Sequence, residues 1–168
     1  MTAEFLIHRE MEHVFAALMP ENRLVCRVCV DTGLRIGDVV ALRSDQLARQ
    51  FWIVESKTGK RRRVNLKQDL LDDLKVHAGS EWVFPGRDPK KHRTRQAVWR
   101  DVKRAAKAFR LPQNVSVHSL RKVYAHDLLN KSKGDLGKVQ KALNHSDAAT
   151  TMIYVMAYQL YQAKYGKG

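Results

Sequence analysis

Polar residues that could perform chemistry gather in four short segments of the chain. Guanidinium groups match phosphate oxygens because they donate two parallel hydrogen bonds. A phosphodiester under attack gains negative charge on its non-bridging oxygens, which two arginines can stabilise. We therefore expect Arg35 and Arg121 to act as a pair on one phosphate. The segments are Thr32-Gly33-Leu34-Arg35-Ile36-Gly37-Asp38, Ser56-Lys57-Thr58-Gly59-Lys60, His118-Ser119-Leu120-Arg121, and Leu143-Asn144-His145-Ser146 followed nine positions after His145 by Tyr154.

Tyr154 is the candidate nucleophile. A phenol has a pKa of about 10 and attacks poorly until bases and nearby cations favour its phenolate. The arginines, lysine and histidines of the four segments would supply that field. Tyr158, one helical turn later, is the rival.

The remaining polar residues suggest proton transfer and orientation. Lys57 sits on a predicted tight turn, where a flexible ammonium can reach a leaving oxygen, and Lys60 is its competitor. His118 lies three residues before Arg121 on a predicted helix, and with an ordinary pKa of about 6.5 its imidazole can move the proton of the nucleophile. His145, at a helix end, can donate to a non-bridging oxygen. Asp38, one turn after Arg35, is expected to orient an arginine or a histidine.

These side chains need a scaffold, and the hydrophobic pattern predicts one. Apolar residues recur near helical spacing from Glu4 to Met19. Two runs, Phe51–Val54 and Arg62–Leu66, flank the turn at 56–60 and predict a β-hairpin. The expected fold class is α+β, mainly helical, with a small antiparallel hairpin. Further helices are expected at Glu21–Asp31, Ile36–Leu42, Asp69–His77, Thr94–Phe109, Val117–Asn130, Leu136–Leu143 and Ala148–Ala157, with Tyr158–Tyr165 as a candidate last one.

The charge is strongly basic and unevenly distributed. The chain has 31 Lys and Arg against 17 Asp and Glu, a net charge of +14. Residues 1–56 hold six basic and eight acidic residues, so the whole excess lies downstream. Residues 57–67 contain six basic residues without an acid, and residues 87–110 contain ten against two acids. Such density favours a polyanion partner through counterion release, and we expect double-stranded DNA rather than an anionic membrane or a merely solvated surface.

Length and composition exclude several classes. The 168 residues allow one compact domain, 1–168, with a hydrophobic core. No apolar stretch is long enough for a membrane span or a secretory leader, so a cytoplasmic protein is expected. Cys26 and Cys29 form a lone C-x-x-C on one helix face and are expected to pack in the core rather than bind zinc. No cofactor and no metal are expected.

The ordered set of motifs resembles the catalytic domain of the tyrosine recombinases, the phage integrase family. An arginine after T-G-L, a lysine at a hairpin tip, H-x-L-R, a later histidine and then a tyrosine occur in the family's order over nearly the whole chain. The resemblance implies DNA cleavage and rejoining through a 3′-phosphotyrosine at Tyr154. It also implies Lys57 as the acid that protonates the 5′-hydroxyl, homotetramers on DNA, and a bacterial or phage element that integrates or excises.

Three departures from the family pattern are visible. Lys122 follows Arg121 where many relatives carry histidine, and Asn144 stands where glycine is frequent. We also expect this chain to lack the N-terminal core-binding domain of the family.

Three alternatives stay open. A type IB topoisomerase or a telomere resolvase would share the chemistry, and a non-catalytic DNA-binding module would use the arginines only to hold the backbone. The strip Tyr158-Gln159-Leu160-Tyr161 either reaches a neighbouring subunit or folds back on its own core.

Overall fold

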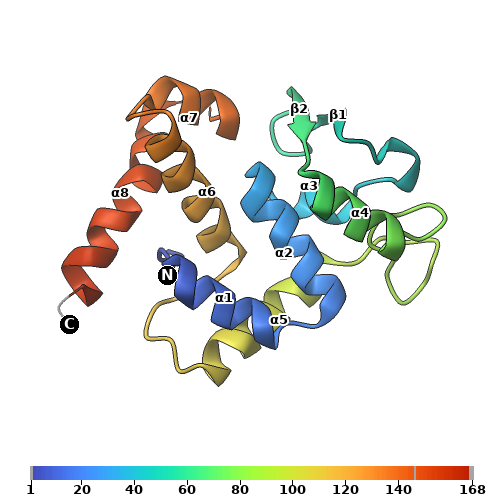
Figure 1. Ribbon diagram of the computed structural model, residues 1–168, viewed down its shortest axis with the longest axis horizontal. Coiled ribbons are helices and arrows are strands. Elements are labelled where there is room, and N and C mark those ends of the chain that lie inside the picture. Colours follow the sequence, from blue (N-terminus) through green and yellow to red (C-terminus); the bar gives the residue numbers. More distant parts are fainter. Residues whose placement is uncertain (1, 146, 167–168) are drawn as a thin grey trace.

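The computed structural model describes residues 2–145 and 147–166 of the chain (Figure 1). Within them helices predominate, and a two-stranded antiparallel sheet is the β-structure, which confirms the predicted fold class. None of the described helices is both long and apolar enough to cross a bilayer. The elements are α1 (His8–Ala17), α2 (Pro20–Thr32), α3 (Ile36–Val40), the 3-10 turn η1 (Ser44–Gln46), β1 (Gln50–Val54), β2 (Arg61–Asn65), α4 (Gln68–His77), α5 (Arg95–Ala108), α6 (Val117–Lys131), α7 (Leu136–Leu143) and α8 (Ala148–Tyr165).

The central helix is α2, because most of its residues are buried. It starts with Pro20 in the first turn, where the missing N–H costs nothing, and ends at Gly33 in the left-handed region with φ 66°. Figure 1 shows α2 in the middle, with α6, α7 and α8 on one side and the hairpin, α3 and α4 on the other. The packing of α2 against α6 thus joins the two sides.

The buried face of α2 contains Cys26 and Cys29, both free thiols. Burial raises the pKa of Cys29 to about 12, so its thiol stays protonated. Their expected role as packed core residues is confirmed.

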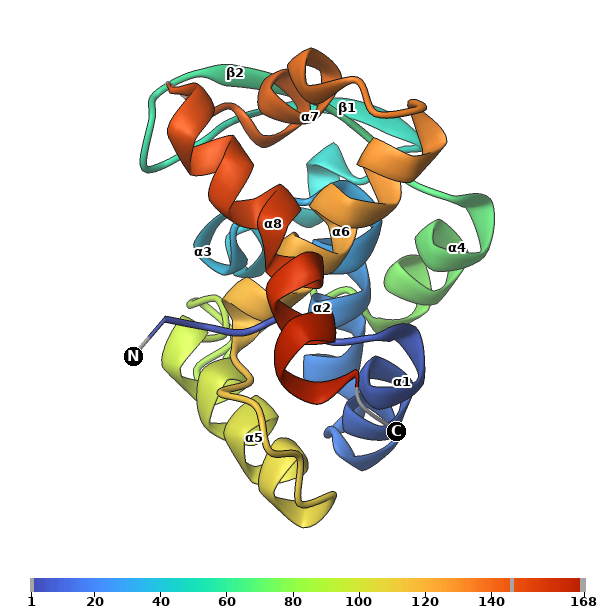
Figure 2. The ribbon, with the colours of Figure 1, turned by 90° about the vertical axis from the view of Figure 1, so that its left-hand side faces the viewer.

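Two helix boundaries differ from the sequence pattern. The first helix begins at His8 instead of Glu4, because residues 2–7 run extended toward α1 (Figure 2) and Glu4 N–H donates to the Asn114 carbonyl (3.0 Å). Phe5 and Leu6 are still buried, which explains their helix-like apolar spacing. At the other end, α8 continues unbroken to Tyr165, and Tyr161 Oη donates to Glu10 Oε1 (2.9 Å). The C-terminal helix therefore packs on its own chain.

The β-hairpin pairs Phe51 with Val64, and both side chains are buried. Trp52 and Val54 alternate to the outer face and are exposed. The hairpin tip, residues 55–60, closes through Glu55 N–H to Lys60 O (3.0 Å) and Gly59 N–H to Glu55 O (2.8 Å).

Candidate active site

Arg121 is the most deeply buried cation of the site, with an exposed fraction of 2%. Its Nη1 donates to the carbonyl of Gly33 and its Nη2 to that of Leu143 (3.3 Å). These carbonyls lie at the C-terminal ends of α2 and α7, where the helix dipoles favour a positive charge. None of the ion pairs among the described residues involves Arg121. Its charge is therefore held by backbone oxygens and is not neutralised by a carboxylate.

Tyr154 lies beside this guanidinium. Burial lowers the pKa of Arg121, whereas the Tyr154 phenol raises it through charge and a side-chain hydrogen bond. The His145 ring packs edge-on against the Tyr154 ring, with centroids 5.0 Å apart. The half-buried phenol on α8 is thus next to one arginine and one imidazole of the predicted set.

Arg35 occupies the N-cap position of α3, directly after the end of α2. Its Nη1 donates to Glu55 Oε2 at 2.7 Å. The Arg35 side chain lines two cavities, of about 680 Å³ and 280 Å³, and Lys57 lines both as well. The larger cavity adds His118 and the smaller one adds His145. Arg35 and Lys57 therefore lie between the two predicted histidines.

The hydrogen-bond partner of Asp38 differs from the one that the sequence predicts. It was expected to orient an arginine or a histidine, but its Oδ1 accepts from Ser56 N–H (2.9 Å) and Ser56 Oγ (2.7 Å). The short helix α3 faces the hairpin tip, where the Ser56 N–H needs an acceptor. Asp38 thus fixes the residue that precedes Lys57.

Both histidines are surrounded by cations. The pKa of His118, exposed on α6, is lowered by loss of hydration and by the charges of Arg121, Lys57 and Arg35. Burial and the charges of Arg121 and Arg35 lower the pKa of His145 to about 4. His145 Nδ1 lies 3.1 Å from Thr151 Oγ1. At neutral pH the imidazole of His145 is therefore neutral, with one nitrogen that donates a hydrogen bond and one that accepts.

The two basic segments of the sequence meet at the larger cavity. Lys57 comes from the hairpin tip, and Arg95, Gln96 and Trp99 come from the first turns of α5. These three α5 side chains are exposed. The cavity thus presents cations, an amide and an indole beside the predicted phosphate-binding arginine Arg35.

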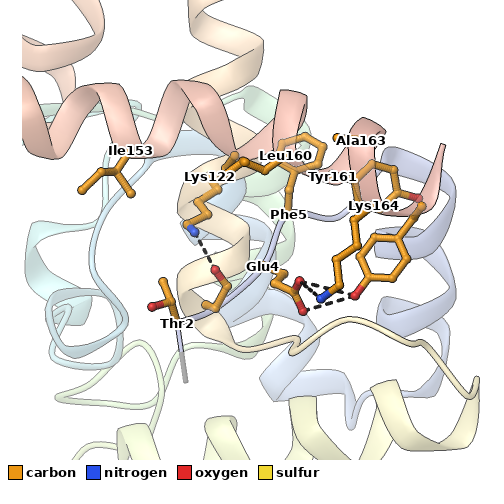
Figure 3. Close-up of a pocket in the computed structure, with 12 residues that line it drawn as sticks. Thr2, Glu4, Phe5, Lys122, Ile153, Leu160, Tyr161, Ala163 and Lys164 are labelled. Carbon is orange, nitrogen blue, oxygen red and sulfur yellow. Dashed lines mark hydrogen bonds and ion pairs between the residues drawn. The ribbon is translucent and has the colours of Figure 1, made fainter.

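The N-terminal segment of the chain packs against α8, the helix that carries Tyr154. Figure 3 shows the N-terminal residues lying along α8, where they line a cavity of about 590 Å³. Lys122 Nζ donates to the Ala3 carbonyl (2.5 Å) and lies 5.9 Å from the centroid of the Tyr154 ring. Glu4 accepts from Lys164 (2.8 Å). Lys122, one of the departures from the family pattern, thus ties the N-terminal segment to α6.

The rival residues lie elsewhere. Tyr158 packs against His126 with tilted rings, centroids 4.2 Å apart, and edge-on against Phe5, on the inner side of α8. Lys60 is exposed and does not line either cavity that contains Lys57. Asn144 adopts the left-handed conformation with φ 53°, which accounts for the frequency of glycine at this position.

Sequence reasoning missed two charged residues of the site, Glu55 and Arg62. Glu55 directly follows β1 and continues the inward-facing series of Phe51 and Ile53. The alternation of the strand therefore predicts an inward carboxylate, and a buried carboxylate needs a partner. Arg62 is the middle one of three consecutive arginines, and the sequence pattern does not distinguish it from its neighbours. The described residues contain no cluster of three or more His, Cys, Asp or Glu side chains suited to hold a metal ion.

The candidate site thus combines two cavities that share Arg35 and Lys57 with the pair Arg121 and Tyr154. Sequence comparison names the class of the protein. The chain belongs to the phage integrase family, whose model matches residues 4–160. It is 36% identical over 134 residues to the tyrosine recombinase XerD of Rhizobium meliloti, covering 73% of this chain and 43% of that protein. It is 30% identical over 132 residues to the probable integrase/recombinase YoeC of Bacillus subtilis, covering 75% of this chain and 72% of YoeC.

Solved structures share the fold. The catalytic core of lambda integrase superposes with a TM-score of 0.73 at 22% identity, covering 86% of this chain and 93% of that one. The catalytic domain of bacteriophage HP1 integrase gives a TM-score of 0.67 at 21% identity, covering 98% and 95%. The chain spans about half the length of most of the curated relatives that it matches, 43% of the XerD protein of Rhizobium meliloti and 50% of a putative integrase of Sinorhizobium fredii.

Proposed function

We propose that this chain cleaves and rejoins DNA strands through a covalent phosphotyrosine at Tyr154. The observation that carries the proposal is the position of the Tyr154 phenol beside Arg121, whose buried charge is not neutralised by any carboxylate of the described residues. A phosphate entering between Arg35 and Arg121 would gain bidentate donors on its non-bridging oxygens.

The reaction balances with the groups at hand. Tyr154 Oη attacks the phosphorus, and a P–O bond forms to the 3′-phosphate while the bond to the 5′-oxygen breaks. Lys57 protonates that 5′-oxygen, and the phenol proton passes to His118. Rejoining reverses the steps: a 5′-hydroxyl attacks the phosphotyrosine, and the phenol leaves. The ester conserves the bond energy, so the exchange needs no nucleotide hydrolysis.

The DNA partner follows from charge and geometry. Both basic segments border the cavity that Arg35 and His118 line. Relatives support the same substrate, because a lambda integrase fragment similar to this chain (TM-score 0.79) was solved bound to DNA. We further propose that the protein acts as a homotetramer on DNA and serves the integration or excision of a mobile element.

Covalent capture tests the proposal. The full chain is incubated with a pool of nicked suicide duplexes that carry a randomised centre, and adducts are separated on a denaturing gel. We expect an adduct with the unmodified chain and with Tyr158→Phe, but not with Tyr154→Phe. Arg35→Ala and Arg121→Ala should lose adduct by orders of magnitude while retaining most DNA binding. Retention of DNA without any adduct would favour the binding module.

Sequencing the captured duplexes and following supercoiled plasmid distinguish the remaining enzymes. Enrichment of one sequence supports a site-specific recombinase, whereas relaxation of plasmid without a specific site supports a topoisomerase. Sedimentation of the chain on a captured site reports whether four copies assemble.

A further inference from the structure

Glu55 is a buried carboxylate that follows the last residue of β1 at the start of the hairpin tip. Its exposed fraction is 0%, although charged side chains are almost never fully buried without partners. An apolar residue would fill this inward position of the strand at lower cost, since buried ion pairs contribute little net stability. The charge at Glu55 therefore calls for an explanation other than packing.

Three donors converge on this carboxylate from three parts of the chain. Oε2 accepts from Arg35 Nη1 (2.7 Å) and from Thr58 Oγ1 (3.2 Å), and Oε1 accepts from Arg62 Nη1 (3.3 Å). Burial raises the pKa of Glu55, but the hydrogen bonds and charges of Arg62 and Arg35 outweigh it and hold the pKa below its usual value. The group is ionised at neutral pH.

Arg62 holds this carboxylate in place relative to the end of α2. Its Nη2 donates to the Thr32 carbonyl and its Nη1 to the Gly33 carbonyl (3.4 Å), at the end of α2. The Arg62 side chain is only 10% exposed. The Gly33 carbonyl also accepts from Arg121, so the same helix end holds both arginines. Glu55 thus connects Arg35, through Arg62, to the end of α2 that also holds Arg121.

We propose that Glu55 is a positioning residue, which aims the Arg35 guanidinium at the phosphate. The inference rests on the proposed function and deepens it. Nη1 of Arg35 is bound to Glu55, while the side chain lines both cavities, so a ligand there would meet the other N–H groups of the guanidinium. Thr58, bound to the same oxygen, follows Lys57 directly, and Asp38 holds Ser56 on the other side.

A DNA-free measurement tests the arrangement independently of the activity. Guanidinium ¹H–¹⁵N signals of Arg35, assigned with Arg35→Lys, are recorded for the unmodified chain, Glu55→Gln and the control Glu81→Gln. Glu81 pairs with Arg43 at the surface (3.2 Å) and is the matched Glu–Arg pair. We expect the Arg35 signals to shift and broaden in Glu55→Gln alone. Unchanged Arg35 signals in a folded Glu55→Gln would overturn the proposal. Should Glu55→Gln not fold, Glu55→Asp keeps the charge, withdraws it by one methylene and gives the same comparison.

A double-mutant cycle tests the role in the reaction. Single-turnover adduct formation on a captured suicide duplex should fall about 10- to 100-fold in Glu55→Gln, because small displacements of a positioning group cost that much. In the Arg35→Ala background the same change should cost less than about threefold, since the residue through which Glu55 acts is already gone. Losses that multiply would show a separate structural role and refute the proposal. Failure of the unmodified chain to form any adduct refutes the proposed function instead, and the guanidinium spectra then decide the positioning separately.

Discussion

Gly33 offers the sharpest test of how the site is built. It ends α2 with φ 66°, and a Cβ added there would lie 2.3 Å from Tyr124 Cδ1 and 2.4 Å from Tyr124 Cε1. Gly59 has nearly the same φ, 65°, but no atom within 4 Å of its would-be Cβ. Comparing Gly33→Ala with Gly59→Ala therefore separates the collision with the Tyr124 ring from the cost of the left-handed backbone.

The magnitudes follow from the two causes. A left-handed alanine costs about 1 kcal/mol in both variants. Overpacking against the ring adds about 1–3 kcal/mol in Gly33→Ala, for a total of about 2–4 kcal/mol. Equilibrium unfolding in urea measures both free energies of unfolding, and the double variant Gly33→Ala/Tyr124→Ala tests whether the ring causes the excess. Equal losses in the two single variants would refute the reasoning.

Three further predictions concern other parts of the structure. The ¹H NMR titration of His145 should have its midpoint at about 4. Because the unfolded imidazole titrates at about 6.5, the unfolded chain binds the proton at higher pH than the folded chain. The free energy of unfolding should therefore fall as the pH drops from about 6.5 to about 4, and it should fall less in His145→Asn. Asp101→Ala should lower the free energy of unfolding by about 2–4 kcal/mol, since the buried carboxylate accepts from Met19 N–H and Asn22 Nδ2 (2.9 and 2.7 Å), and an undiminished urea midpoint would contradict this. Leu143→Ala, at a fully buried position of α7, should cost about 2–5 kcal/mol, and a loss below 1 kcal/mol in urea unfolding would show that α7 is dispensable for the core.

Local patterns were sufficient to predict most of the elements. The turn Ser56-Lys57-Thr58-Gly59-Lys60 requires a left-handed residue, which Gly59 supplies with φ 65°. The helices at 117–130 and 136–143 match α6 and α7 to within one residue, because their apolar spacing reflects the faces they bury.

Long-range contacts decided what the sequence pattern could not. Phe5 and Leu6 have helical spacing, yet residues 2–7 are extended because Glu4 binds the backbone of Asn114, 110 positions away. The partner of Asp38 lies on the hairpin tip, and that of Glu55 lies 20 positions earlier at Arg35. Which carboxylate meets which donor depends on how α3 faces the hairpin, and periodicity carries no such information.

The acceptors that hold Arg121 and Arg62 are the carbonyls of Thr32, Gly33 and Leu143. Every amino acid has a main-chain carbonyl, so replacing Thr32 or Leu143 deletes no acceptor as long as the chain keeps its path. A substitution there can therefore weaken the core and still leave the electropositive centre its acceptors, whereas Gly33 cannot take a side chain without meeting the Tyr124 ring.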